Sequence, residues 1–299
     1  MRGSVNSPFE SPEPLTAMQR FILTLSGPDR MGIVAAVTSF LLEHECNIVE
    51  SAQFGDPATL QFFMRVSFDS NRVATAEHLQ QTFSKVGEKF SLQWAVYDTS
   101  VKPRLLILVS KFGHCLNDLL YRHRIGALPV EIPAIVSNHR DFYRLAAQSD
   151  IPFHYLPVDS QNKQKQESQL LEIVGQEHCD LVVLARYMQI LSPNVCEQLA
   201  GRAINIHHSF LPSFQGAKPY SQAHDRGVKL IGATAHYVTA DLDEGPIIEQ
   251  DVARVDHSMS VEACAGVGRD VECAVLARAV QWHVEHRILL NGHRTVIFR

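Results

Sequence analysis

The chain has 299 residues, of which 45% are hydrophobic and 20% are charged. This composition excludes disordered and fibrous proteins and provides enough apolar residues for a large core. Lys and Arg total 27 against 32 Asp and Glu, so the formal net charge is −5. Because no basic excess is present to neutralise a phosphate backbone, nucleic acid is not expected as a partner. The longest apolar runs fall far short of the roughly 20 residues of a membrane-spanning helix, and membrane association is not expected either.

The chain begins with a polar stretch that we interpret as a flexible leader over residues 1–17. This stretch contains three Pro and three Ser and lacks the apolar centre of a secretory signal. Six Cys occur at positions 46, 115, 179, 196, 264 and 273, with no C-x-x-C pair among them. Buried, reduced thiols in a cytoplasmic protein are therefore expected.

The segment 18–98 has short alternating patterns that predict a small domain. Apolar residues alternate with polar ones in 21–25, 48–54, 60–68 and 92–96, which predicts half-buried strands. Apolar residues recur at helical spacing in 33–41 and 79–86. The order strand, helix, strand, strand, helix, strand predicts a ferredoxin-like sandwich. A polar run ending at Pro103 then predicts a linker over 99–103.

The remaining segment, 104–299, is predicted to form a second, larger domain. The runs 105–109 and 181–185 are continuously aliphatic, which is typical of strands buried on both faces. A further strand is expected over 130–136 and a polar-faced helix over 165–177, and this alternation predicts a doubly wound, mostly parallel α/β sheet. Two more strands are expected over 231–238 and 247–255. A long closing helix is expected from the N-cap Ser260 to about Leu289.

The stretch 204–212 contains the most informative polar residues. Asn205 and His207 are two residues apart, so on a strand their side chains would point to the same side. Two N–H groups that converge on a carbonyl oxygen can stabilise the negative charge that develops when the carbonyl is attacked. The alternative is that Asn205 caps a turn beside half-buried histidines. Similarly, the acids in 241–244 before Gly-Pro could form a solvated turn or hold one carboxylate near the sheet.

Together these motifs resemble a known family over residues 104–299. The stretch 204–212, His236 and the stretch 243–248 resemble the catalytic motifs of the formyltransferase family that handles 10-formyltetrahydrofolate. In that family Asn, His and Asp form the active site, which implies catalytic roles for Asn205, His207 and Asp243. We expect Asp243 to orient and deprotonate water, and the other two to hold the formyl oxygen.

The same resemblance implies a set of substrate-binding residues. The segment 184–191 resembles the one that lines the pterin pocket, which implies that Tyr187, Met188, Gln189 and Ile190 contact the folate. Three further candidates are His208, His236 and Lys218. The two histidines could equally be ordinary hydrogen-bonded residues, and Lys218 could pair with the glutamate tail of folate or be an exposed loop lysine.

The segment 25–34 resembles the strand-to-helix turn of an ACT domain, a small-ligand module with the strand order predicted above. The resemblance implies an amino-acid effector near Asp29, Met31, Gly32 and Ile33, although a plain tight turn is the alternative. ACT domains commonly pair through an exposed sheet edge, so a homo-oligomer, either dimer or tetramer, is expected.

An ACT domain followed by a formyltransferase-like domain resembles the formyltetrahydrofolate deformylase family. The resemblance implies hydrolysis of 10-formyltetrahydrofolate to tetrahydrofolate and formate, which would supply formate for purine biosynthesis and balance the one-carbon folate pools. It implies no cofactor, since the folate is the substrate. The stretch 110–115 lacks the Gly-Ser-Asn type of phosphate loop of ribonucleotide-using relatives, and no basic C-terminal domain follows. Both differences favour water as the acceptor.

Two alternatives remain open at this point, and two further chemistries are disfavoured. A formyltransferase that passes the group to an amine would differ only in its acceptor pocket, and a non-catalytic folate or amino-acid sensor would bind without turnover. A zinc site is disfavoured because adjacent histidines on a strand would point to opposite faces, and its candidate ligands would be His207, His208, His236 and Asp243. A Ser-His-Asp hydrolase has no Gly-x-Ser-x-Gly motif to support it.

Overall fold

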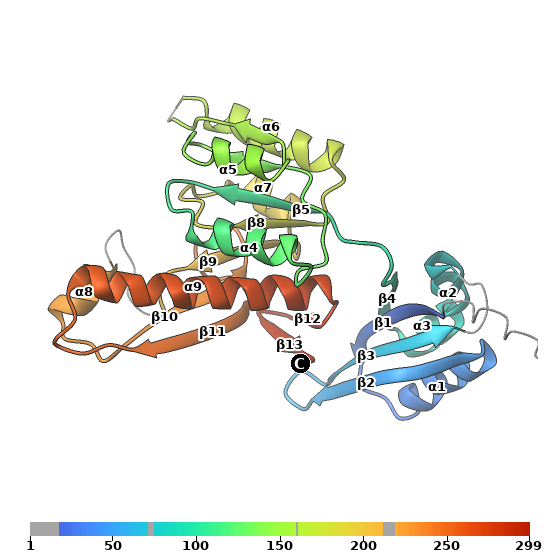
Figure 1. Ribbon diagram of the computed structural model, residues 1–299. Helices are drawn as coiled ribbons and strands as arrows, with labels where there is room; N and C mark the ends of the chain where they lie inside the picture. The colour runs from blue at the N-terminus through green and yellow to red at the C-terminus, as the bar shows by residue number, and fades with distance from the viewer. Residues whose placement is uncertain (1–17, 71–74, 160, 212–218) are drawn as a thin grey trace, which may run out of the picture. The chain divides into compact units, whose positions relative to one another are not determined.

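The structure is a computed structural model that describes residues 18–70, 75–159, 161–211 and 219–299 (Figure 1). The chain divides into two compact units, and the boundary lies between Val101 and Lys102. The expected leader, 1–17, lies outside the described residues. Each unit has its own sheet and its own hydrophobic core.

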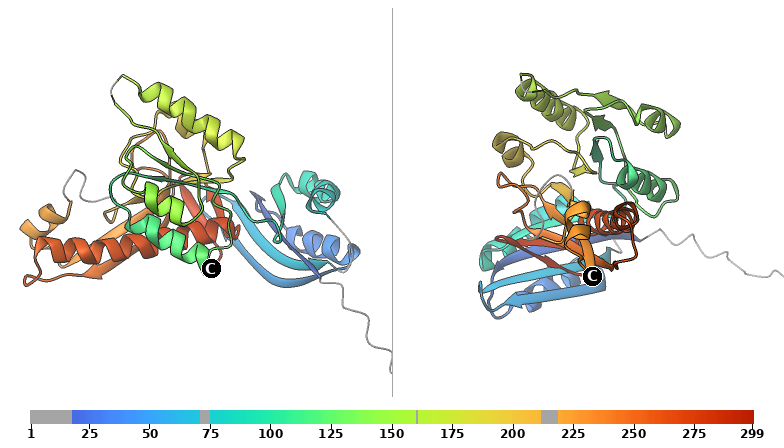
Figure 2. Two further views of the ribbon diagram at one scale, coloured as in Figure 1. Left: turned by 45° about the horizontal axis from the view of Figure 1, so that its top comes forward. Right: turned by 90° about the vertical axis from the view of Figure 1, so that its left-hand side faces the viewer.

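The N-terminal unit is the expected ferredoxin-like sandwich. Its strands are β1 (Gln19–Pro28), β2 (Cys46–Asp56), β3 (Gln61–Ser70) and β4 (Gln93–Asp98). Its helices are α1 (Ile33–Glu43), α2 (Ala76–Thr82) and α3 (Ser84–Phe90). The sheet is antiparallel with the order β2-β3-β1-β4, and the helices cover one of its faces (Figure 2).

Two details of this unit differ from the expectation. The helix predicted over 79–86 is divided into α2 and α3 at Phe83, whose buried ring packs edge-on against Phe40 with 5.0 Å between centroids. The strand β3 is buried on both faces instead of one. On the polar face, Arg65 and Asp69 pair with Glu50 and Arg20 from the flanking strands, at 3.0 and 2.7 Å.

The C-terminal unit has a seven-stranded sheet with the order β11-β10-β9-β8-β5-β6-β7. Its strands are β5 (Leu105–Val109), β6 (Ile135–Ser137), β7 (Phe153–Tyr155), β8 (Leu181–Leu184), β9 (Ala203–His207), β10 (Leu230–Tyr237) and β11 (Ile247–Arg254). The strands β5 to β9 are parallel, and β10 and β11 are antiparallel to their neighbours. This arrangement confirms the mostly parallel, doubly wound sheet.

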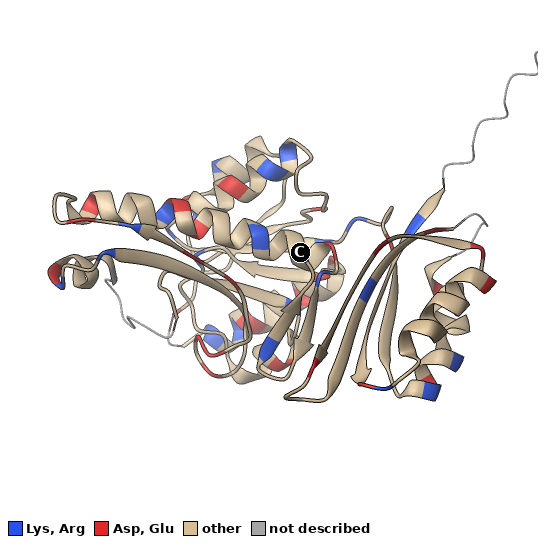
Figure 3. Cartoon of the chain, turned by 90° about the horizontal axis from the view of Figure 1, so that it is seen from below, with Lys and Arg blue, Asp and Glu red and all other residues tan. Residues whose placement is uncertain are grey.

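Helices cover both faces of this sheet, which explains the fully aliphatic strands β5 and β8. They are α4 (His114–Arg124), α5 (Tyr143–Gln148), α6 (Lys163–Gln176), α7 (Pro193–Gln198), α8 (Pro219–Asp225) and α9 (Val261–Val284). One core contains apolar residues of α4, α5 and α9, and the other contains those of α6 and α7. Acidic and basic residues are interspersed along α9 (Figure 3).

Two predicted elements of this unit are wrong in extent. The strand expected over 130–136 is confined to β6, because Pro133 has no N–H to donate to a sheet and Glu131 makes only an isolated bridge to Arg104. The closing helix begins after the N-cap Ser260 as expected, but it ends at Val284. It is followed by a hairpin with strands β12 (Ile288–Asn291) and β13 (Arg294–Ile297).

Two expectations from composition can be compared with the structure. All six cysteines are free, and four of them are buried: Cys115, Cys179, Cys196 and Cys264. None of the described helices combines the length and apolar character that a membrane span requires.

Candidate active site

The strand pair β9 and β10 positions three polar side chains at the edge of the parallel part of the sheet. On β9, Ile204 and Ile206 are buried in the core, and the alternation of a strand directs Asn205 and His207 to the opposite side. In the antiparallel register, His236 of β10 pairs with Asn205. The amide Nδ2 of Asn205 lies 3.2 Å from the Nε2 of His236. The register therefore makes these two side chains neighbours across the strands.

Asp243 reaches the same place from the loop between β10 and β11. Its backbone is in the left-handed region, with φ of 58°, and a Cβ at Gly245 would overlap the carbonyl oxygen of Tyr237. The loop is closed by the N–H of Tyr237, which donates to the carbonyl of Pro246 at 2.9 Å. Glycine at 245 is thus needed for the close approach of the loop to the strand, which sets the direction of the Asp243 carboxylate.

The carboxylate of Asp243 contacts both histidines. Its Oδ2 lies 3.2 Å from the Nδ1 of His207, and its Oδ1 lies 3.6 Å from the Nε2 of His236. Burial disfavours the charged carboxylate, but the hydrogen bond from His207 and the nearby ring of His236 outweigh it and hold the pKa of Asp243 well below its usual range. Asp243 is therefore ionised at neutral pH, and the Nδ1 of His207 donates to it.

The other ring nitrogen of His207, Nε2, is buried, and no hydrogen-bond partner for it exists among the described residues. A buried polar atom without a partner costs free energy, which a bound group would recover. In this fold the hydrogen bond to Asp243 fixes the ring so that Nε2 is the free position.

A cavity of about 350 Å³ lies against these residues. Asn205, His207 and Asp243 line it, as do the predicted substrate-binding residues Tyr187, Met188, Gln189, Ile190, His208 and His236. The structure thus brings together all but one of the predicted catalytic and substrate-binding residues of this unit. The exception, Lys218, lies outside the described residues.

The relation between His207 and His208 differs from the expectation. Their rings do not point to opposite faces of a strand but stack, with 4.9 Å between centroids and an interplanar angle of 22°. The reason is that β9 ends at His207, so the alternation of a strand does not extend to His208. The argument from alternation against a zinc site therefore does not apply to this pair.

Three buried polar residues that hold the site were not recognised from the sequence. The Ser110 hydroxyl accepts the N–H of Met188 at 2.9 Å and donates to Asn138 at 2.7 Å, so that backbone N–H is not open to a ligand. The Thr234 hydroxyl donates to the carbonyl of Ser209 at 2.9 Å and fixes the turn after β9. Single Ser, Asn and Thr residues beside strands have no distinctive spacing, so no sequence signal identifies them.

The four residues proposed to bind an effector lie at the start of α1. Gly32 is the N-cap, with φ of 96°, and the N–H of Asp29 donates to the carbonyl of Leu60 at 2.9 Å. Met31 is fully exposed, whereas the side chain of Ile33 is buried in the core. Of Ile33, therefore, only the backbone is open to a ligand.

Comparison with known proteins agrees with both units. The formyl transferase family matches residues 103–280, and the ACT domain family matches residues 19–97. The formyltetrahydrofolate deformylase of Corynebacterium sp. (strain P-1) is 48% identical over 281 residues, which cover 94% of this chain and 98% of that protein.

Solved structures show the same relationship. The crystal structure of formyltetrahydrofolate deformylase from Burkholderia mallei ATCC 23344 is 53% identical with a TM-score of 0.91, covering 94% of this chain and all of that one. The glycinamide ribonucleotide transformylase 1 of Symbiobacterium toebii is 29% identical with a TM-score of 0.63, covering 68% of this chain and 97% of that one. Since the deformylases match both units over nearly their whole length, the chain belongs to the formyltetrahydrofolate deformylase family.

Proposed function

We propose that this chain hydrolyses 10-formyltetrahydrofolate to tetrahydrofolate and formate, and that Asn205, His207 and Asp243 perform the reaction. The observation that carries the proposal is the contact between the Asp243 carboxylate and the Nδ1 of His207, which leaves the Nε2 of His207 unpartnered beside the cavity. An imidazole held in this way can donate to an oxygen that becomes negatively charged.

The formyl carbonyl is polarised by two donors. The Nε2–H of a protonated His207 and the amide of Asn205 hold the formyl oxygen, and the ionised Asp243 stabilises the positive charge of the imidazole. Attack by water on the formyl carbon breaks the carbonyl π bond, and the electron pair moves to the held oxygen. The amide of Asn205 is oriented for this task by the ring of His236 at 3.2 Å.

Asp243 and His207 exchange two protons with the reacting atoms. Asp243 accepts a proton from the attacking water, and His207 donates its Nε2 proton to the leaving folate nitrogen as the bond between carbon and nitrogen breaks. A carboxylate with a lowered pKa is a weak base, but its basicity increases when its imidazolium partner loses its charge. The two transfers therefore favour each other, and the products are tetrahydrofolate, formate and one released proton.

Binding of the substrate is assigned to the wall formed by residues 187–190. Tyr187 is buried, while Met188 and Ile190 are more than half exposed at the cavity, which suits the flat ring of a pterin. The reaction requires no cofactor in this scheme. Further parts of the proposal are a cytoplasmic location, an amino-acid effector at the ACT unit and a homo-oligomer.

The experiment that tests the function is an assay of formate release from 10-formyltetrahydrofolate without any added amine. A deformylase releases formate at the rate of tetrahydrofolate formation, whereas a formyltransferase would need the amine and a sensor would bind without turnover. Turnover should also persist after treatment with a chelator. Formate release that depends on an added amine, or that disappears on chelation, would contradict the proposal.

A further inference from the structure

Two cysteines of the C-terminal unit lie against each other, and the reaction scheme above uses neither. Cys115 is in the first turn of α4, and Cys273 is in the middle of α9. Both thiols are free, and both pack in the core that contains apolar residues of α4, α5 and α9. The other four cysteines belong to different cores. The pair is therefore a dithiol at the contact between two helices.

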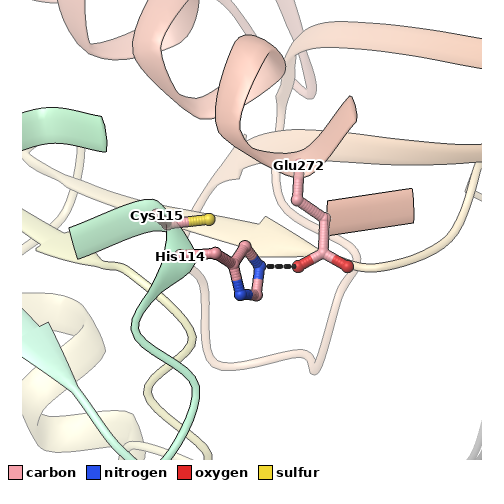
Figure 4. A group of neighbouring side chains, drawn as sticks. All are labelled: His114, Cys115 and Glu272. Carbon is pink, nitrogen blue, oxygen red and sulfur yellow. Dashed lines mark hydrogen bonds and ion pairs between the residues drawn. The ribbon is translucent and has the colours of Figure 1, made fainter. Parts of the chain in front are cut away.

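The residues that precede the two cysteines also contact each other. His114 directly precedes Cys115, and its Nε2 lies 2.7 Å from the carboxylate of Glu272, which directly precedes Cys273. The Cys115 sulfur lies within 4.8 Å of a ligand atom of both His114 and Glu272. Figure 4 shows this sulfur beside the His114 ring, on the side of α4 that faces Glu272. The packing of the two helices thus places residues 114 and 115 opposite residues 272 and 273.

The two thiols differ in exposure and in protonation. Cys115 is 1% exposed, whereas Cys273 is only partly buried. A hydrogen bond with Cys273 and burial raise the pKa of the Cys115 thiol. Cys115 therefore stays protonated and donates to the sulfur of Cys273. A small oxidant from solvent reaches Cys273 first, and Cys115 lies directly behind it.

A metal ion is a less suitable partner for Cys115. The possible ligand set would be Cys115, His114 and Glu272. However, the Nε of Arg186 lies 3.4 Å from the Glu272 carboxylate, and its positive charge would repel a cation. A thiol that stays protonated is also a poor ligand, because metals bind the thiolate. The sulfur of Cys273 is therefore the more suitable partner.

We propose that Cys115 and Cys273 form an oxidation site, at which a peroxide converts the two thiols into a disulfide between α4 and α9 and thereby weakens binding of the folate. The bridge is reversible, because a dithiol reductant exchanges with it. Formation of the bridge is independent of the proposed hydrolysis, whereas its effect on the folate rests on that function.

Hydrogen peroxide supplies the oxidising equivalents in two steps. The sulfur of Cys273 attacks one peroxide oxygen, the bond between the two oxygens breaks, and a sulfenic acid and water form. The sulfur of Cys115 then attacks the sulfur of Cys273, the bond between sulfur and oxygen breaks, and the Cys115 proton leaves with the hydroxyl as a second water. The two sulfurs lose two electrons in total, and the peroxide gains them.

The contacts around the pair extend to the active-site cavity. Glu272 contacts His114 at 2.7 Å and Arg186 at 3.4 Å. Arg186 lines the cavity and directly precedes the wall formed by residues 187–190. A covalent bond draws two sulfurs closer together than a hydrogen bond does, so the start of α4 shifts against α9. This shift changes the contacts of His114 and Glu272, and the wall loses part of its support.

The test treats the reduced full-length protein with hydrogen peroxide in the presence of a chelator. It compares the wild type with Cys115→Ser and Cys273→Ser. The matched control is Cys264→Ser, because Cys264 is also on α9 but packs in another core. Intact mass and peptide mapping without reductant detect the bridge. The KM for 10-formyltetrahydrofolate is measured before oxidation, after oxidation, and after reduction with dithiothreitol.

We expect the wild type and Cys264→Ser to lose the mass of two hydrogen atoms, to yield a linked peptide pair containing Cys115 and Cys273, and to show a KM raised about threefold or more. Dithiothreitol should reverse both changes. Neither Cys115→Ser nor Cys273→Ser should form the bridge or change its KM.

Three outcomes would overturn the proposal. The first is a wild type that gains oxygen at Cys273 without a bridge, and the second is a bridge between two copies of the chain. The third is an equal KM change in Cys273→Ser, which would assign the effect to another oxidised residue. The mass measurement requires no turnover. A bridged wild type that releases no formate even when reduced would therefore reject the proposed function and leave the oxidation site intact.

Discussion

The carboxylate of Asp243 contacts the imidazole of His207 at 3.2 Å, and this contact joins a loop to the end of a strand. It keeps the carboxylate ionised, and it leaves the Nε2 of His207 as the free nitrogen at the cavity. Both properties depend on the charge of Asp243. A neutral side chain of the same shape therefore tests the role of this charge while the packing of the site is kept.

Asp243→Asn is expected to lower kcat for formate release by about 10²–10⁴-fold, because it removes the acceptor for the water proton. The folate should still bind, with KM within a few-fold of the wild type, since the cavity keeps its shape. Steady-state assays of formate and tetrahydrofolate measure both values. The matched control is Glu244→Gln, which changes the adjacent acid, exposed and outside the cavity lining, and should leave kcat unchanged. Near-normal kcat in Asp243→Asn would contradict the assigned role.

Asn205→Ala is expected to reduce kcat by about 10²–10³-fold with little change in KM, because an oxyanion donor acts in the transition state more than in the bound substrate. Asn194→Ala, on the surface of α7, removes an amide whose partner is Gln198 and serves as the control. A loss confined to KM would show instead that Asn205 only binds the folate.

The two predictions concern residues that the sequence identified to different degrees. The spacing of Asn205 and His207 was sufficient to place both on one side of a strand, because the alternation of a strand is a local property. The approach of Asp243 depends on a left-handed backbone and on the bond between Tyr237 and Pro246. Neither is encoded in local spacing, so only the resemblance to a family indicated Asp243.

His236 illustrates the same limit. Its position opposite Asn205 follows from the register of β9 and β10, which is set by long-range pairing. From sequence alone it remained equally an ordinary hydrogen-bonded histidine. The contacts of Glu272 with His114, Arg186 and Tyr220 were not predicted at all, because these residues come from four separate segments of the chain.

The fold was more predictable where elements are long or strongly patterned. The aliphatic runs of β5 and β8 were located to within one residue, since burial on both faces excludes polar residues. The strands β6 and β12 lack so long an aliphatic run, and the sequence did not locate them correctly. The hairpin after α9 did have a signal, because Asn291-Gly292 is a preferred turn pair, and Gly292 has φ of 61°.

Ser110→Ala is expected to raise KM for the folate more than it lowers kcat. The buried hydroxyl holds the N–H of Met188, and its removal leaves that group and the amide oxygen of Asn138 without a partner, at a cost of about 1–3 kcal/mol in stability. The wall formed by residues 187–190 should therefore lose its fixed position. Ser149→Ala, which removes an exposed hydroxyl bonded to Leu145, is the control. An unchanged KM in Ser110→Ala would show that the wall is held by other contacts.

The stability of the C-terminal unit should decrease on acidification between about pH 6.5 and pH 4, because of His283. Burial lowers the pKa of this histidine to about 4, and its Nδ1 lies 2.8 Å from the hydroxyl of Tyr237. Between these pH values the unfolded chain binds a proton at this position and the folded chain does not. The free energy of unfolding therefore decreases as pH falls, by about 3 kcal/mol in full.

His283→Gln keeps a hydrogen-bond partner for Tyr237 and removes the titration. Denaturant titrations from pH 4.5 to 7 should therefore show a smaller pH dependence for His283→Gln than for the wild type, while the exposed His257→Gln should match the wild type. Equal slopes for all three proteins would mean that His283 is protonated in the folded state over this pH range, and would contradict the prediction.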